Sequence, residues 1–330
     1  MKKHSVKIIC CYYGKLPEWI DYWLLSCSYN PTFDFLFVSD SVYSGSAPDN
    51  VTFLNMSLDE LKERFSSVLG FKAAIDNPYK LCDYRPIYGL AFQDYLTDYD
   101  FWGHCDLDII FGNLSAFITD SLLDKYDRIG QLGHLMLYRN NSFMNHMFAN
   151  KGGAFSYNKV FHDPDHYGFD EITGMNMILL NQSVPSYKLP IVDAQRYLTR
   201  VSCFPNTPDE EFYCWRDGEI LRVYNHNGIK TDAYAYLHFQ RKHPRISDEP
   251  MDPNNGFYIE SDYFSARKAK DFTVSEIAQR FNRIPHNDAL DFKTGNRNRI
   301  KDIVFKKNFN QKRIFIGKAI ALIKNRMPLQ

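Results

Sequence analysis

The stretch Tyr99-Asp-Phe-Trp-Gly-His-Cys-Asp-Leu-Asp-Ile-Ile-Phe-Gly112 decides how the rest of the chain is interpreted. Phe101 to Cys105 are bulky and mostly apolar, which predicts a buried strand leading directly into Asp106-Leu107-Asp108. Residues i and i+2 of a strand point to the same face, so the two carboxylates converge while Leu107 turns back into the core. Two carboxylates at the end of a buried strand are suitable ligands for Mn²⁺ or Mg²⁺. The bound ion could in turn hold the phosphate oxygens of a diphosphate. The alternative is a pair of aspartates that only caps a turn.

Five blocks of sequence surround this stretch in a fixed order: Asn77-Pro-Tyr-Lys-Leu-Cys-Asp-Tyr-Arg-Pro86, Phe101-Trp-Gly-His-Cys-Asp-Leu-Asp108, Gly133-His-Leu-Met-Leu-Tyr-Arg139, Tyr167-Gly-Phe-Asp-Glu171 and Leu237-His-Phe-Gln240. Together they resemble a family of bacterial polysaccharide-biosynthesis glycosyltransferases with the GT-A fold, over residues 5 to 245. The resemblance implies an α/β fold: a GT-A-like, Rossmann-like mixed sheet flanked by helices, with a C-terminal helical appendage. It also implies a nucleotide-sugar donor, which we expect to be UDP-linked, such as UDP-galactose or UDP-glucose. The implied acceptor is a hydroxyl of a lipid-linked oligosaccharide in capsule or O-antigen synthesis.

A length of 330 residues allows one large domain or a domain and a half. We expect a glycosyltransferase domain over residues 1–245, a linker or lid with a helical extension over 246–300, and a basic amphipathic tail over 301–330. The linker is predicted because residues 244–256 are rich in Pro, Asp and Asn.

Charge is unevenly distributed along the chain, although the net charge is zero. Residues 301–326 hold eight Lys or Arg against the single acid Asp302, which leaves 31 basic and 38 acidic residues elsewhere. A mildly acidic body is a poor nucleic-acid binder. The apolar residues of the tail fall near one face of a helical wheel, which suits an interfacial helix on an anionic membrane. The alternative is an ordinary helix packed on the body. These apolar residues are Phe305, Phe309, Ile316, Ile320 and Ile323.

The cysteines and the apolar runs bear on localisation. Seven cysteines, an odd number with no Cys-x-x-Cys pair, lie mostly in apolar runs and indicate reduced thiols of a cytoplasmic protein. The N-terminus has no long apolar region typical of a signal peptide, and no uncharged apolar run approaches the ~18 residues of a spanning helix. We expect a cytoplasmic protein that is peripherally associated with the inner face of the cell membrane.

The N-terminus predicts a β-α-β unit: a strand over Val6–Cys11, a helix with Pro17 in its first turn, and a second strand over Phe33–Val38. Two strand ends then lie side by side, where open α/β sheets bind nucleotides. The glycine-rich fingerprint of dinucleotide folds and the Walker lysine loop are both absent from the sequence. The candidate donor-binding residues at these strand ends are Tyr12, Tyr13 and Asp40.

Three charged residues, Lys80, Asp83 and Arg85, precede a helix that is expected to start near Pro86. In the functional interpretation, Lys80 and Arg85 face the donor phosphates and Asp83 contacts the base or ribose. The alternative is a solvated helix start that Asp83 caps.

The resemblance implies a third metal ligand, because GT-A sites commonly take a histidine from a returning strand. His238 stands at the matching place, and a neutral imidazole is a good Mn²⁺ ligand. Arg241 and Lys242 follow and could meet the leaving diphosphate. The alternative is a packed histidine followed by surface charges. Regular alternation also puts His104 on the face of the two aspartates, as a group that supports the metal ligands.

Asp170 and Glu171 are the candidates for activating the acceptor. If the reaction inverts the anomeric centre, a carboxylate must remove the proton of the acceptor hydroxyl. The alternative is that Asp170 caps the helix expected from Gly168 and Glu171 favours its dipole.

Two rivals remain beside the metal-dependent glycosyltransferase. A haloacid-dehalogenase-type phosphatase also uses Asp-x-Asp, but it places the motif on its first strand and needs Thr or Val two residues after the second aspartate, where this chain has Ile110. A non-catalytic sugar-binding or scaffold protein on the same fold is the second rival. Such a protein would be a glycosyltransferase fold that has lost its catalytic residues, and the presence of Asp106, Asp108 and His238 together argues against that loss.

Overall fold

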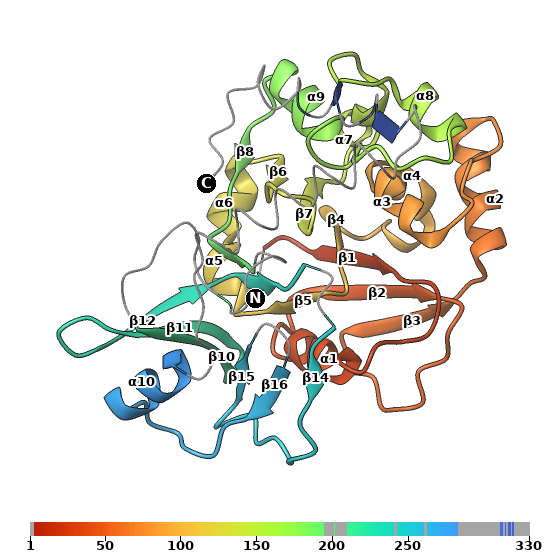
Figure 1. Cartoon of the computed structure of the whole chain (residues 1–330). Coiled ribbons are helices and arrows are strands. Elements are labelled where there is room, and N and C mark those ends of the chain that lie inside the picture. Colours follow the sequence, from red (N-terminus) through yellow and green to blue (C-terminus); the bar gives the residue numbers. More distant parts are fainter. Residues whose placement is uncertain are drawn as a thin grey trace.

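A computed structural model describes residues 3–194, 201, 210–240, 243–260 and 263–282, and in the tail residues 311, 312, 314, 316, 317 and 319. Over these residues the fold is α/β, as expected, with mixed sheets flanked by helices (Figure 1). The longest sheet has the strand order β3-β2-β1-β4-β7-β6-β8. Its strands are β1 (Val6–Cys11), β2 (Asp34–Ser39), β3 (Val51–Asn55), β4 (Phe101–Cys105), β6 (Arg128–Ile129), β7 (Leu135–Arg139) and β8 (Ser186–Tyr187).

Strands β1 to β4 are parallel, whereas β7 runs antiparallel to β4. Both faces of the parallel part are covered, which explains why every residue of β4 is buried. Because β2 lies on one side of β1 and β4 on the other, the chain reverses its direction of winding between β1 and β4. Open α/β sheets bind ligands at the carboxyl ends of the strands at such a point.

The helices divide between the two faces of this sheet (Figure 1). Helix α1 (Ile20–Ser28) packs Trp23 against Phe35, and the alternating residue Leu36 faces the helices on the other side. Helix α2 (Leu58–Leu69) begins at the predicted capping box of Ser57 and ends at Gly70, whose φ is 74°. The helix expected from Pro86 is instead a series of short α-helices and 3-10 helices. They are η1 (Pro78–Lys80), α3 (Leu81–Tyr84), η2 (Arg85–Ile87), α4 (Tyr88–Ala91) and η3 (Gln93–Tyr95).

Short helices lie in the segment between β5 (Ile109–Phe111) and β8. They are α5 (Leu114–Phe117), α6 (Asp120–Lys125), α7 (Ser142–Asn145), η4 (Met147–Ala149), α8 (Tyr157–His162) and α9 (Met175–Asn181). Helix α9 was expected to open at Gly168, but residues 169–174 form turns. Gly168 has a φ of 70°, and a left-handed residue cannot belong to the first turn of an α-helix.

Two further sheets complete the fold. The first has the order β5-β13-β9, formed by β5 (Ile109–Phe111), β13 (Tyr236–His238) and β9 (Ile191–Asp193). The second has the order β12-β11-β10-β15-β16-β14, formed by β12 (Ile229–Tyr234), β11 (Glu219–Asn225), β10 (Glu211–Arg216), β15 (Phe257–Ile259), β16 (Tyr263–Ala266) and β14 (Arg245–Ile246). The Trp215 indole donates to the carbonyl of Phe111 at 3.1 Å and so ties the two sheets together.

The segment expected as a linker or lid from residue 246 contains strands. The predicted boundary at residue 245 falls inside β14, and β15 pairs with β10 of the preceding segment. Helix α10 (Val274–Asn282) buries Ile277 against the same sheet. The Pro- and Asn-rich composition marks only the turns between these strands. How the chain divides into independent domains stays a prediction.

The predicted basic tail lies mostly outside the described residues. Of those described, Ile314 is buried in the same apolar cluster as Tyr167, whereas Ile316 is 57% exposed. Gln311 donates to Asp165 at 3.2 Å. At least this part of the tail therefore packs on the body. Within the described residues, no helix combines the length and apolar character needed to cross a bilayer.

Candidate active site

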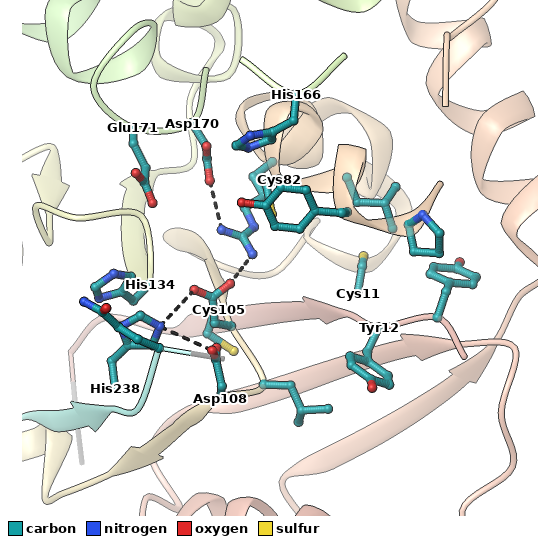
Figure 2. Close-up of a pocket in the computed structure, with 18 of the residues that line it drawn as sticks. Cys11, Tyr12, Cys82, Cys105, Asp108, His134, His166, Asp170, Glu171 and His238 are labelled. Atoms are coloured by element: carbon teal, nitrogen blue, oxygen red, sulfur yellow. Dashed lines mark hydrogen bonds and ion pairs between the residues drawn. The ribbon is translucent and has the colours of Figure 1, made fainter. Parts of the chain in front are cut away.

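A cavity of about 690 Å³ opens at the carboxyl ends of β1 and β4 (Figure 2). Its volume is in the range of small-molecule sites, about 300–1,000 Å³. Most of the candidate residues line it, although they come from distant parts of the chain. These are Tyr12, Tyr13, Arg85, Asp106, Asp108, Asp170, Glu171 and His238.

The backbone of Asp106-Leu107-Asp108 is held by three hydrogen bonds. The N–H of Asp106 donates to the carbonyl of His134 at 2.8 Å, and the carbonyl of Asp108 accepts from the N–H of Phe239 at 3.0 Å. The Trp19 indole donates to the carbonyl of Leu107 at 3.0 Å. Leu107 is buried in the core, as predicted, so both aspartates face the cavity.

The structure brings the three predicted metal ligands together. The Nε2 atom of His238 lies 3.5 Å from Oδ2 of Asp108 and 3.9 Å from Oδ2 of Asp106 (Figure 2). Ligand atoms about 2.1 Å from one ion lie no more than about 4.2 Å apart, so small rotations would let all three reach one ion. Two carboxylates and one imidazole form a donor set that fits Mn²⁺ or Mg²⁺.

The electrostatic environment of His238 depends on its neighbours. Burial lowers the pKa of His238. Hydrogen bonds with Asp108 and Asp193 and the charges of these carboxylates together raise it by more, so the pKa is about 10. Ligation requires the neutral imidazole, so binding of an ion there must release this proton.

Arg85 connects the predicted metal ligands with the candidate base. Its Nη2 donates to Asp106, and its Nη1 donates to Oδ2 of Asp170 at 2.9 Å (Figure 2). Arg85 lines the cavity, so its charge is available to an anionic ligand there. In this structure, however, two carboxylates hold the guanidinium.

Asp170 and Glu171 lie in the turn before α9 and not in its first turn. The N-cap residue of α9 is Gly174, and no side chain caps it, so the capping alternative is wrong. Asp170 is 1% exposed, its Oδ1 has no hydrogen-bond partner, and burial raises its pKa well above the usual value, with opposition from Arg85. Glu171 packs against Gly133, where a Cβ atom would lie 2.5 Å from Cγ of Glu171.

The predicted contacts of Lys80 with the donor phosphates and of Asp83 with the base or ribose are wrong, because neither residue lines the cavity. Both side chains are fully buried, so they do not form a solvated helix start either. The Nζ of Lys80 donates to Asp83 at 2.9 Å and to the carbonyls of Val160 at 2.8 Å and Asp165 at 2.6 Å. Asp83 also accepts the N–H groups of Tyr167 and Phe169, both at 2.8 Å. This ion pair holds the loop that carries Asp170.

The remaining candidates differ in their placement. Asp40 is exposed, accepts the N–H of Gly14 at 3.2 Å, and does not line the cavity. Arg241 and Lys242 lie outside the described residues. His104 is fully buried near the rings of Tyr88 and Tyr138, and neither of its ring nitrogens has a hydrogen-bond partner. The prediction that His104 supports the metal ligands is therefore wrong: the chain leaves regular strand geometry after Cys105, so alternation does not extend to the aspartates.

The polar residues around His238 that sequence reasoning missed include His134, Asp193 and Gln240. His134 and Gln240 belong to the blocks that carry the family resemblance, and this was the available signal. Asp193 had no signal in the sequence. It ends a short apolar run, and only the pairing of β9 with β13 places it beside His238.

Comparison with protein families gives a match over most of the chain. The model of a family described as "Family of unknown function (DUF6625)" matches residues 8–268. The chain belongs to this family. No curated protein matches this DUF6625 member.

Two solved structures of LgtC are similar to this chain. One is the galactosyltransferase LgtC in complex with donor and acceptor sugar analogs, with 10% identity, a TM-score of 0.34, and coverage of 58% of this chain and 77% of that chain. The other is an active-site mutant of LgtC, with 11% identity, a TM-score of 0.34, and coverage of 72% and 91%.

Proposed function

We propose that this protein is a metal-dependent glycosyltransferase that moves a hexose from a nucleotide sugar to an acceptor hydroxyl. The observation that carries the proposal is the convergence of Asp106, Asp108 and His238 at one end of a 690 Å³ cavity. The cavity opens where ligands bind in open α/β sheets, between the carboxyl ends of β1 and β4. Since β4 is the fourth strand along the chain, the motif is not on a first strand, where a haloacid-dehalogenase phosphatase would place it.

Each group has a distinct role in this proposal. Asp106, Asp108 and His238 would hold Mn²⁺ or Mg²⁺, and the ion would neutralise the leaving diphosphate. Tyr12 and Tyr13 line the cavity and would contact the nucleotide. Their phenol rings offer an apolar surface with polar ends. We further propose a UDP-sugar, such as UDP-galactose or UDP-glucose, and a lipid-linked oligosaccharide of capsule or O-antigen synthesis as acceptor.

A thermal-shift panel tests the proposal. UDP-, GDP-, ADP- and dTDP-sugars are each added with Mn²⁺ and with EDTA. Stabilisation by one nucleotide sugar only in Mn²⁺ is expected, because a ligand that binds only the native state raises the melting temperature. If none of the nucleotide sugars stabilises the protein, the result would favour the scaffold alternative and contradict the proposal.

Glu171→Gln should lower kcat by at least about 10²-fold while donor affinity stays within about threefold, if the transfer inverts the anomeric centre. Glu171 is the better placed base, because it lines the cavity and is partly exposed, whereas Asp170 is 1% exposed. Asp170→Asn should weaken donor binding as well, because Arg85 loses a carboxylate that positions its guanidinium at the cavity. The kinetics of both variants distinguish these roles. Small losses of equal size in kcat and in donor affinity would refute the base assignment. A product with retained configuration would refute it as well.

We also propose that the protein is cytoplasmic and that its basic tail binds the inner face of the membrane near a lipid-linked acceptor. Lys306→Glu with Lys307→Glu should reduce binding to anionic vesicles about tenfold or more, since each basic residue contributes about 1 kcal/mol. Substitution is preferable to truncation because the tail residue Ile314 is buried in the body.

Co-sedimentation with vesicles of anionic and of neutral lipid measures this effect. The matched control carries the same charge change at Lys151 and Lys188, which are exposed on the body. If the tail variant and the control pellet equally with anionic vesicles, the tail has no membrane role.

A further inference from the structure

The orientation of His238 is set by a neighbouring strand. Strands β13 and β9 are parallel, and their register pairs His238 with Asp193. The Nδ1 atom of His238 lies 2.8 Å from Oδ1 of Asp193. The opposite ring atom, Nε2, points toward Asp106 and Asp108 (Figure 2). The imidazole therefore lies between one carboxylate on its outer side and two on its cavity side.

Asp193 is itself held by Gln240, two residues beyond His238. The Nε2 amide of Gln240 donates to both carboxylate oxygens of Asp193, each at 2.9 Å. Gln240 has a φ of 44°, a left-handed backbone conformation that is unfavourable for a residue with a side chain. This backbone turn directs the amide back to Asp193, so the contact coincides with a locally unfavourable conformation.

The ring of His238 is also confined from one face. The His134 ring stacks on it with a centroid distance of 3.6 Å and an interplanar angle of 30°. His134 is held in turn through its backbone, because its carbonyl accepts the N–H of Asp106. Rotation of the His238 ring is thus restricted by a hydrogen bond at Nδ1 and by a stacked ring.

We propose that Asp193, held by Gln240, is a positioning residue that fixes His238 with Nδ1–H toward Asp193 and the Nε2 lone pair toward Asp106 and Asp108. This inference rests on the proposed metal site. A histidine that ligates a metal commonly donates its other N–H to a carboxylate, which fixes the tautomer and increases the basicity of the ligand. Removal of such a partner typically weakens metal binding about 10- to 100-fold.

The test measures Mn²⁺ affinity directly, by the loss of the free-ion signal in electron paramagnetic resonance, without donor or turnover. Asp193→Ala should weaken Mn²⁺ binding about 10- to 100-fold. Asp193→Asn should lose less, because its amide oxygen can still accept the Nδ1–H. Gln240→Ala should give a smaller loss in the same direction. The matched control is Asp127→Asn, a half-buried carboxylate that pairs with Arg139 away from the cavity.

The outcomes separate this inference from the proposed function. Melting curves in EDTA first show that each variant is folded. Wild-type protein that binds no Mn²⁺ would overturn the metal site and this inference together. Wild-type protein that binds Mn²⁺, with Asp193→Ala binding equally well, would overturn only the inference. Equal losses in Asp193→Ala and Asp193→Asn would indicate a charge effect and contradict a positioning role.

Discussion

Asp108→Ala is expected to abolish Mn²⁺-dependent binding of the nucleotide sugar and to lower turnover by about 10³-fold or more. The carboxylate of Asp108 lies 3.5 Å from His238 and faces the cavity, so its loss leaves an ion with two protein ligands. Metal stabilisation of a leaving diphosphate contributes several kcal/mol, and each 1.36 kcal/mol corresponds to about tenfold in rate. Asp108 is a clearer test than Asp106, because removal of Asp106 also frees Arg85.

The measurements are donor-dependent thermal shift with and without Mn²⁺ and the steady-state rate of sugar transfer. Asp124→Ala is the control, since Asp124 is a half-exposed carboxylate that pairs with Lys3 far from the cavity. Both variants should keep the wild-type melting temperature in EDTA. Normal activity of Asp108→Ala in saturating EDTA would contradict the proposed metal dependence.

Lys80→Met is expected to destabilise the fold by about 3–5 kcal/mol, because it removes the hydrogen-bonded cation from the buried carboxylate of Asp83 and leaves it with His166, whose Nε2 lies 3.8 Å from Oδ1. The carbonyls of Val160 and Asp165 lose their donor in the same step. Each kcal/mol lowers the melting temperature of a domain of 150–250 residues by about 2–4 °C, so a fall on the order of 10 °C is expected. Thermal and denaturant unfolding measure the effect.

A double variant provides the control for this ion pair. Adding Asp83→Asn to Lys80→Met removes the buried negative charge. The N–H groups of Tyr167 and Phe169 bind different oxygens of Asp83, so the single amide oxygen keeps an acceptor for one of them, and part of the stability should return. Donor affinity of the folded fraction should change little in either variant. A stable Lys80→Met protein that no longer binds donor would restore the phosphate contact predicted from the sequence.

Local patterns predicted those features whose cause is local. The apolar run before Asp106 predicted β4, and the bulk of Leu107 predicted that this side chain would turn inward, because burial of an apolar side chain is favourable in any context. The capping box at Ser57 and the glycine at position 70 predicted both ends of α2. The third member of the proposed metal site, His238, depended on the family resemblance, since no pattern of spacing links residues 130 positions apart.

Predictions failed where distant segments decide the environment. Lys80 and Asp83 have the composition of a surface helix start. Their hydrogen-bond partners come from residues 160–169, the end of α8 and the loop that follows it. Strands β14 to β16 are two to four residues long and lie among turn residues. Whether such a short segment forms a strand is decided by its pairing with a neighbouring strand.

The sequence by itself determined the α/β class, the buried strand β4 and the pair of carboxylates that follows it. Tertiary structure decided that His238 reaches those carboxylates, that Arg85 joins Asp106 to Asp170, and that Asp193 and Gln240 hold the imidazole. The physical reason is that strand and helix preferences act over a few neighbouring residues. Hydrogen bonds and ion pairs in a site join side chains wherever the fold places them, and their separation along the chain carries no information about that geometry.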